Sequence, residues 1–448
     1  MAEQQQLYRF GPIDLAPGIR PMHVSTKLWA AFIGVAMLSG ISFLQGYVLT
    51  EHLHIPRNQQ GTVSGDLSFW VEVVAIFLFT PVGVLADRIG RRPVYICGII
   101  IMGIGYGLVP YATSVAELMV FRLVITVGMA AVAGTLATLT NDYPMENSRG
   151  KLIGITSMAN ILGTILMSVG IARIPSFLAE RGYDAVTGGK AMFLAATLLC
   201  MVTAVVARFG LKSGTPVARR ERASTRTLLT SGLRAGRNSR IALSYAAAFA
   251  ARSDLVIKGL FLVLWAIQDG MKQGMNPGES MARFGVMMAI MSGTSLAAAP
   301  FFGWFMDRVN RVTATIVALT FATVGYLSMG IITSPLDFAM IPYFLIISLG
   351  SSFMLKASLG LIGQEAPPKE RGSVIATNSL FGALGILIFT VVGGRLFDAW
   401  GPWAPFVIAG VYQVFLLAVA IIVRIVSPGI SVEEQRQKQK QMSAAITA

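Results

Sequence analysis

Long apolar stretches separated by short polar links dominate the chain. Each stretch has about the roughly 20 residues that a helix needs to cross a bilayer, and breakers such as glycine, proline and charged residues bound it. The pattern predicts membrane-spanning helices at residues 27–50, 64–85, 93–112, 116–141, 151–172, 190–210, 241–266, 281–303, 312–332, 338–361, 372–394 and 402–426. We therefore expect an all-α membrane protein with about twelve transmembrane helices.

The longest polar link divides this pattern into two sets of six helices. The predicted parts are an N-terminal segment (1–26), an N-terminal six-helix bundle (27–210), a basic linker (211–240), a C-terminal six-helix bundle (241–426) and a tail (427–448). The N-terminal segment is polar and rich in proline, without the early apolar core of a cleavable signal peptide, so we expect the first helix to direct insertion. In the tail, residues 433–440 indicate a solvated segment or a short surface helix.

Composition supports the membrane assignment. Hydrophobic residues make up 54% of the chain, charged residues only 13%, and the mean hydropathy is +0.66. So much apolar surface must face lipid, because a water-soluble domain could not expose it. Both cysteines lie inside apolar runs, so we expect no disulfide framework.

The net charge of +14 has the distribution of a topology signal, not of a nucleic-acid-binding surface. Basic residues gather in alternate links: Arg88, Arg91, Arg92, Arg149, Lys151, Arg308, Arg311, Lys369 and Arg371. Others crowd the central linker: Arg219, Arg220, Arg222, Arg226, Arg234, Arg237 and Arg240. The positive-inside rule places these links and both termini in the cytoplasm, with the protein in the cell (inner or plasma) membrane.

The two halves repeat each other. Gly83, Asp87 and Arg88 follow the second predicted helix, and Gly303, Asp307 and Arg308 follow the eighth at an offset of 220 residues. Arg149 precedes the fifth helix and Arg371 the eleventh at an offset of 222 residues. Parallel repeats of this kind place a solute site between the halves near the middle of the membrane, where rocking exposes it to each side in turn.

The loop after the second helix resembles a motif of the major facilitator superfamily. The run is Gly83-Val84-Leu85-Ala86-Asp87-Arg88-Ile89-Gly90-Arg91-Arg92, and a weaker copy covers residues 303–311. Twelve helices and a long central basic link are also expected of that family, so the resemblance covers nearly the whole chain. It implies two six-helix bundles in a monomeric secondary transporter.

The resemblance also implies a gate. Asp87 with its arginines would hold the cytoplasmic side closed in the outward-open state, while Gly83 would permit close helix packing and Gly90 a tight turn. The alternative is a basic turn that only sets topology. In the second copy Asn310 replaces the glycine, so we expect a less tightly turned loop there.

Two family elements fit incompletely. Arg122 stands in the fourth helix, as in the family, but Thr126 occupies the position where the first glycine is usual. Gly163 in the fifth helix is followed by Thr164, whereas drug/proton antiporters carry a glycine-proline signature there. The missing proline weakens the multidrug-efflux interpretation.

Charged residues inside the predicted helices are the main candidates for solute binding or ion coupling, because each costs about 2.5 to 3.5 kcal/mol to insert. They are Glu72, Arg122, Arg252, Asp254, Lys258 and Lys356. At about 1.5 Å per residue, Glu72 lies roughly 12 Å and Arg122 roughly 9 Å below the outer surface. This pair is either a proton or cation carrier or a static brace.

In the seventh helix, Asp254 and Lys258 share a face and are expected to neutralise each other. Arg252 points elsewhere, either to an anionic group on a solute or to a structural partner. Lys356 either contributes to the same site or extends to the membrane surface. Neutral candidates for a pocket are Gln45, Tyr47, Asn160 and Asn378, each of which could instead bond a neighbouring helix.

The sequence thus favours a secondary active transporter for a small organic solute, with a slight preference for an anionic or amphiphilic one and coupling to protons or another cation. Alternatives are a proton-coupled exporter of hydrophobic or cationic compounds, a lipid-handling transporter, and a non-transporting sensor on the same scaffold. No metal-ligand or nucleophile spacing and no nucleotide phosphate loop is visible, so we expect no enzyme activity, no cofactor and no direct ATP drive.

Overall fold

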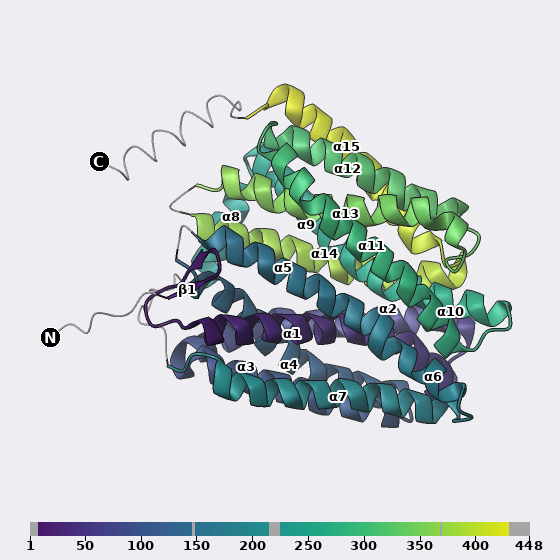
Figure 1. The fold of residues 1–448 in the computed structure, drawn as a ribbon. Helices are drawn as coiled ribbons and strands as arrows, with labels where there is room; N and C mark the ends of the chain where they lie inside the picture. Colours follow the sequence, from purple (N-terminus) through teal and green to yellow (C-terminus); the bar gives the residue numbers. More distant parts are fainter. Residues whose placement is uncertain (1–7, 146–147, 215–224, 368–369, 430–448) are drawn as a thin grey trace. The chain divides into compact units, whose positions relative to one another are not determined.

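The computed structural model describes residues 8–145, 148–214, 225–367 and 370–429, which are almost entirely helical (Figure 1). The helices before the central linker are α1 (Pro21–Tyr47), α2 (Arg57–Ile89), α3 (Arg91–Leu108), α4 (Val115–Asp142), α5 (Arg149–Ile165), α6 (Ile174–Ala179) and α7 (Ala185–Gly210). Those after it are α8 (Thr225–Ala235), α9 (Ser239–Ile257), α10 (Val263–Lys272), α11 (Pro277–Met306), α12 (Arg311–Ser328), α13 (Ile341–Glu365), α14 (Arg371–Ala399) and α15 (Ala404–Val426).

Shorter turns extend several of these helices. Three are wide π-helical turns: η1 (Val48–His52) after α1, η4 (Leu166–Gly170) after α5 and η6 (Lys258–Leu262) between α9 and α10. Other described turns are 3₁₀ in type: η2 (Val109–Tyr111), η5 (Ile171–Arg173), η7 (Met329–Ile331) and η8 (Phe338–Met340). The predicted helices are confirmed, with ends that shift by a few residues.

Within the described residues, 11 helices are long and apolar enough to cross a membrane. The remaining predicted span is the continuous run α9–η6–α10, which carries Arg252, Asp254 and Lys258 in its middle. Helices suit this environment because hydrocarbon offers no partner for backbone N–H and C=O groups, which a helix pairs within itself.

The described chain falls into two compact units. One comprises Met1–Arg220 with Gly259–Ser292, and the other Glu221–Lys258 with Gly293–Ala448. In the first unit, α3 packs against α4 and α7, and α1 packs against α5 and α7. In the second, α12 packs against α13 and α15, and α9 against α13 and α14 (Figure 1). The unit boundaries fall inside the seventh and eighth predicted helices.

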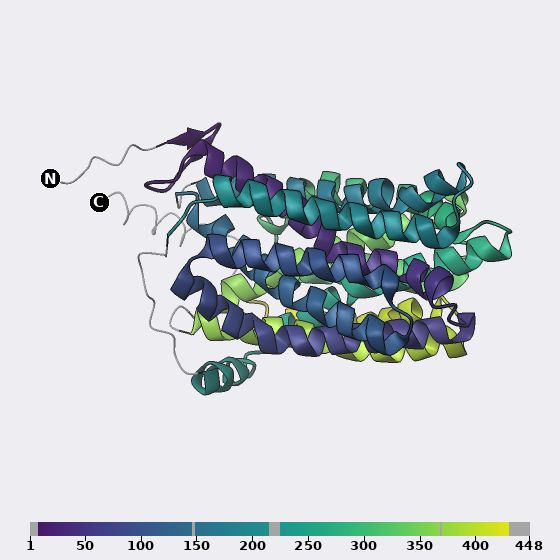
Figure 2. The same ribbon diagram turned by 90° about the horizontal axis from the view of Figure 1, so that it is seen from below.

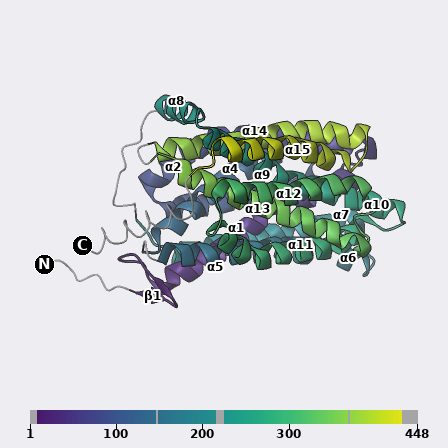
Figure 3. The ribbon, with the colours of Figure 1, turned by 90° about the horizontal axis from the view of Figure 1, so that it is seen from above.

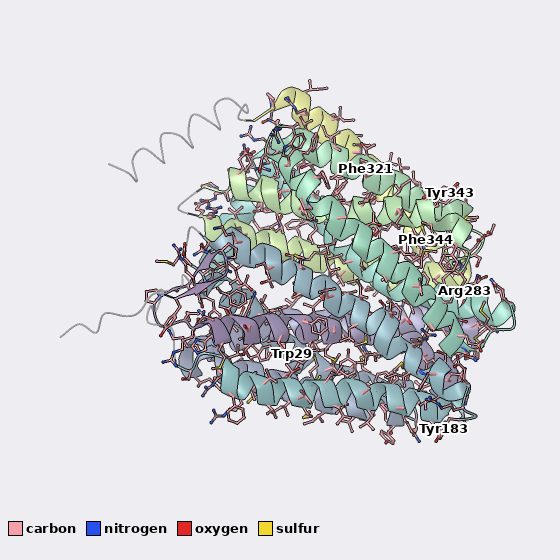
Figure 4. All side chains as sticks on the ribbon, viewed as in Figure 1. Trp29, Tyr183, Arg283, Phe321, Tyr343 and Phe344 are labelled. Carbon is pink, nitrogen blue, oxygen red and sulfur yellow. The ribbon has the colours of Figure 1, made fainter. Side chains whose placement is uncertain are left out.

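Glycine allows the closest of these helix contacts. At Gly163 of α5, an added Cβ would lie 2.1 Å from the backbone oxygen of Phe32 on α1. Small residues commonly allow such backbone approach in membranes, where packing rather than hydrophobic burial holds helices together. Side chains such as Trp29 on α1 and Phe344 on α13 lie between the helices (Figure 4).

The N-terminal segment forms a small structure that the sequence did not predict. Strands β1 (Arg9–Phe10) and β2 (Ile13–Asp14) pair antiparallel at the start of α1 (Figure 2). Ile13 and Leu15 are fully buried, and Leu15 forms a bridge with Pro144 beyond α4. The hairpin is therefore docked on the loop between α4 and α5.

The central linker also contains unpredicted structure. Helix α8 lies beside the start of α14, where the hydroxyls of Ser231 and Ser373 are 2.6 Å apart (Figure 3). Tyr245 of α9 donates a hydrogen bond to the backbone oxygen of Gly232, 2.8 Å away. Arg219, Arg220 and Arg222 of the linker lie outside the described residues, as does the predicted tail segment 433–440.

Replacement of Gly163 by alanine tests the α1–α5 contact. We expect Gly163→Ala to lower stability by about 1 to 3 kcal/mol, because the new methyl group would overlap the backbone of α1. Gly154→Ala is the matched control in the same helix, since its Cβ would meet nothing within 4 Å and alanine is the better helix former. Thermal unfolding in detergent measures both; equal melting temperatures would contradict the contact.

Candidate functional site

The loop that resembles the family motif is a one-residue turn. Helix α2 ends at Ile89 and α3 begins at Arg91, so Gly90 alone reverses the chain, with a φ of 96° that favours glycine. An added Cβ at Gly90 would lie 2.8 Å from the backbone oxygen of Gly214. The predicted tight turn is confirmed, while Asp87 and Arg88 are exposed at the end of α2.

The arginine after this turn is tied to a different helix. Arg91 forms an ion pair with Asp142, the last residue of α4, and Arg92 beside it is half-buried. The sequence pattern indicated charge interactions centred on Asp87, and Asp142 was not predicted as a partner. Asp142 is an acidic residue at the end of the apolar run that forms α4, and this position could have indicated a partner for the arginines.

The second copy of the motif has different geometry. Four residues separate α11 from α12, and Asn310 caps α12 by accepting a hydrogen bond from the Val312 N–H at 2.9 Å. Asp307 pairs with Arg311 at 2.9 Å, one turn away. The less tightly turned loop is thus confirmed, and its reason is that the asparagine at the cap has a φ of −60°.

Two further members of the second copy make no close helix contact. Arg308 of the loop stacks over the ring of Trp304 in the last turn of α11, 3.8 Å from its centroid. An added Cβ at Gly303 would meet nothing within 4 Å, so this glycine is not required for packing here.

The loop after α4 lies between the turn at Gly90 and the N-terminal hairpin. Tyr143 follows Asp142 and accepts a hydrogen bond from the Lys212 N–H at 3.2 Å, while the Ser148 hydroxyl accepts one from Asp14 N–H at 3.0 Å. Burial raises the pKa of Tyr143 to about 12, so its hydroxyl stays neutral at physiological pH. Lys151 donates to the Pro12 backbone oxygen at 2.8 Å.

Arg122 is the most enclosed predicted charge of the first unit. Its side chain is 2% exposed, and its Nε and Nη1 atoms have no hydrogen-bond partner among the described residues. No carboxylate lies within 4 Å of it in the described chain, so the predicted pair with Glu72 is not formed in this structure. Glu72 is half-buried in α2 and has interactions of its own.

The neutral candidates of the first unit differ in their bonding. Tyr47 donates to the Ala185 backbone oxygen at 2.8 Å, the helix-bridging role that the sequence left open. Gln45 is 1% exposed, and neither its amide oxygen nor its nitrogen has a partner in the described residues. The Asn160 side-chain oxygen is likewise buried without a donor.

A small cavity lies in the first unit. Its volume is about 40 Å³, and it is lined by Ser39, Phe43, Thr164, Met167, Ser168, Gly259 and Met288. Its lining is neutral, with three hydroxyls and two thioethers. None of the predicted solute-binding residues lines it.

Asp254 is the centre of a buried polar network in the second unit. Its carboxylate is fully buried and accepts hydrogen bonds from Gln413 Nε2 on α15, at 2.9 Å to Oδ1 and 3.0 Å to Oδ2. The Tyr326 hydroxyl of α12 donates to the Asp254 backbone oxygen at 3.0 Å. Lys258, one turn away, forms no ion pair with it within 4 Å, so the amide supplies the close contact that the sequence assigned to the lysine.

The other predicted cations are separated from this network. Arg252 lies against Gly382 of α14, where an added Cβ would be 2.5 Å from its Cδ. Lys356 donates to the Ser352 hydroxyl at 2.7 Å. Asn378 accepts from the Ser244 hydroxyl at 3.3 Å and so joins α14 to α9.

The most informative residues missed by the sequence analysis are Gln413, Tyr326 and Lys27. Gln413 is the polar position in the middle of a very apolar helix, a signal that was present but unused. Tyr326 looks like an ordinary aromatic core residue. Lys27, at the predicted start of the first helix, looks like a surface residue, yet it is fully buried.

Comparison with known proteins places this arrangement in a family. The family model described as Major Facilitator Superfamily matches residues 28–335 and 259–447. The chain is 28% identical over 390 residues to the magnetosome protein MamH of Paramagnetospirillum magneticum, covering 84% of this chain and 87% of MamH. It is 24% identical over 362 residues to the multi-drug resistance efflux pump PmrA of Streptococcus pneumoniae, covering 80% and 85% of the two chains.

A solved structure has the same fold. The crystal structure of the nucleoside transporter NupG aligns with 89% of this chain and 98% of its own, at a TM-score of 0.70 and 14% sequence identity. At that identity the likeness concerns the fold alone. The fold is that of an all-α membrane protein with twelve helices in two six-helix halves.

The contact between Gln413 and Asp254 gives a test of the network. We expect Gln413→Leu to lower stability by about 1 to 3 kcal/mol, because the buried carboxylate loses its side-chain donor. In an Asp254→Asn background, the same change should cost less, since a neutral amide is easier to bury. Thermal unfolding of the wild-type protein, the two single variants and the double variant measures this coupling, and strictly additive losses would contradict it.

Proposed function

Since the chain belongs to the Major Facilitator Superfamily, we propose that it moves a small organic solute by alternating access and couples that movement to protons. It is a multi-pass membrane transporter and not an enzyme. The finer assignment, to a solute class and a coupling ion, rests on charged groups inside the helices.

The observation that carries the proposal is that each unit encloses a charged residue within its membrane-spanning helices. Arg122 is 2% exposed in the first unit, and Asp254 is fully buried in the second. Enclosed charges are expensive, and a structural role would favour full compensation, yet two nitrogens of Arg122 have no partner in the described residues. Buried charges of this kind suit a transporter that binds a charged solute or ion in a different conformation of the protein.

The solute is proposed to be anionic or amphiphilic. Arg252 is half-buried and makes no hydrogen bond or ion pair among the described residues. Lys258 is likewise without a carboxylate within 4 Å, and Lys356 has a neutral serine partner. These three cations outnumber Asp254, the acidic candidate of the second unit, so the candidate charges of that unit carry a net positive charge that would attract an anion.

Proton coupling is proposed to involve Asp254 and Glu72. A carboxylate changes its affinity for a proton when its hydrogen-bond donor or neighbouring charge moves. Asp254 depends on one side-chain donor from another helix, so displacement of α15 from α9 would change its environment. Glu72 would act similarly if the fourth helix brought Arg122 to it.

A second candidate is export of hydrophobic or cationic compounds. The likeness to PmrA along 80% of the chain favours it, and Asp254 and Glu72 would then attract the cation. The missing proline after Gly163 counts against it.

The motif around Gly90 is proposed to act as a gate. The ion pair between Arg91 and Asp142 joins α3 to α4 beside the exposed Asp87. Because a few kcal/mol suffice to change the populations of two states, loss of this pair would bias the equilibrium. We further propose a monomer in the cell membrane with both termini in the cytoplasm.

Flux into proteoliposomes tests the proposed solute class and coupling. The probes are nicotinate, its neutral isostere nicotinamide, the nucleoside uridine and the cation ethidium, with pyranine inside to report protons. We expect nicotinate to move faster than nicotinamide and to carry protons. Arg252→Gln should reduce that preference about tenfold, a loss of about 1.4 kcal/mol.

The control is Arg395→Gln, at an exposed position of α14. Equal reduction by both variants would remove Arg252 from the proposal. Ethidium movement without nicotinate movement would favour the export function.

A further inference from the structure

Lys27 is a buried cation that the proposed transport mechanism does not use. It lies in the second turn of α1, and its side chain has no exposed surface. Its Nζ atom donates a hydrogen bond to the Thr156 hydroxyl on α5, which donates in turn to the Leu152 backbone oxygen at 2.7 Å. The enclosure is therefore formed by two helices of the first unit.

Among the residues that the structure describes, no acidic side chain pairs with this amine. Helices α1, α5 and α7, which pack together here, contain no aspartate or glutamate. On α4, Asp142 pairs with Arg91, and Glu117 bonds Thr113 at the other end of the helix. Asp14 of the hairpin pairs with Arg9 at 2.7 Å. Within the described residues, no carboxylate lies within 4 Å of Lys27.

The other titratable or charged groups on the surrounding elements do not supply negative charge. They are His23 and Tyr47 on α1, Arg91, Arg92, Tyr95, Cys97 and Tyr106 on α3, Arg122 on α4, Tyr143 after α4, Arg149 and Lys151 on α5, Lys190, Cys200 and Arg208 on α7, and Lys212 after α7. The Tyr95 hydroxyl donates to the Ala30 backbone oxygen at 3.0 Å, and His23 Nδ1 accepts from the Arg20 N–H at 3.1 Å. An ammonium in this place carries a free-energy cost that a neutral amine does not.

The second half of the protein makes the same helix contact without a charge. Thr156 and Asn378 each lie seven residues beyond the first residue of their helices, Arg149 and Arg371. Asn378 accepts a hydrogen bond from Ser244, which lies five residues beyond the start of α9, as Lys27 lies six residues beyond the start of α1. The α9–α14 link is thus the repeat of the α1–α5 link.

The neutral link in the second half shows which part of the Lys27 contact is needed for helix packing. A neutral serine and asparagine are sufficient to join the equivalent helices of the second half. Holding α1 against α5 therefore does not require a lysine, and the cost of enclosing its charge calls for another explanation.

We propose that Lys27 is a proton-exchanging residue of the first half. When α1 and α5 part, water reaches Nζ and the amine takes a proton from it. When the helices close on Thr156, the ammonium returns that proton to water, leaving the neutral amine. Acid thus favours the parted arrangement and alkali the closed one, so proton binding is coupled to helix movement. The inference rests on the proposed proton coupling and adds a residue to it.

Acetylation of the wild-type protein in liposomes tests the exchange without any solute. Sulfo-N-hydroxysuccinimide acetate reacts with accessible amines, and mass spectrometry gives the rates at Lys27 and at Lys151, an exposed reference on α5. We expect the acetylation rate at Lys27, divided by that at Lys151, to rise as the pH falls from about 8.5 to 6.5. Exchange of one proton limits this rise to about tenfold per pH unit. An unmodified Lys27 throughout, while Lys151 reacts to completion, would overturn the proposal.

Proton movement in Lys27→Met proteoliposomes tests the coupling itself, with Lys151→Met as the matched control. The probe is whichever of nicotinate, uridine and ethidium the wild-type protein carries. We expect Lys27→Met to equilibrate the probe but to lose accumulation driven by a pH gradient, while Lys151→Met keeps it. Coupled transport that persists in Lys27→Met overturns the role of Lys27 alone. Wild-type transport without proton movement overturns the proposed coupling, and the role with it.

Discussion

The cost of an unpaired polar group in hydrocarbon is the constraint on which this structure depends. It makes the spanning backbone helical, because only a helix pairs its N–H and C=O groups without help from a neighbour. It then leaves side-chain packing and a few polar contacts to hold the helices together. Close approaches such as Gly163 against Phe32, and individual polar contacts such as that of Gln413 with Asp254, therefore have more influence here than in a water-soluble core.

The same constraint explains why much of the fold could be predicted from the sequence. Apolar runs of the required length can hardly be anything other than spanning helices, and glycine, proline and charge mark their ends. The turn at Gly90 and the looser one at Asn310 followed from the conformational range of the two residues. The hairpin before α1 and the helix α8 were missed because each is stabilised by docking on other parts of the chain, which local pattern does not record.

The candidate site was only partly accessible to such reasoning. Sequence spacing identifies which charges lie in the helices, but a residue's partner on another helix depends on how the helices are rotated. Asp254 was therefore assigned Lys258, its neighbour along the chain, and not Gln413, which is 159 residues away. Lys27 was overlooked because a lysine at the start of an apolar run normally reaches water. The closing of α1, α5 and α7 around it is a tertiary event.

The π-helical turns η1, η4 and η6 have a practical consequence for work along the first, fifth and seventh helices. Each accommodates an extra residue in a wider turn, and one residue corresponds to about 100° of rotation. A count of 3.6 residues per turn that starts before a π-helical turn therefore gives the wrong direction for the side chains after it. Spin labels and cross-linking pairs on these helices must therefore be chosen by counting from the nearer end, with Lys258–Leu262 treated as a break in phase.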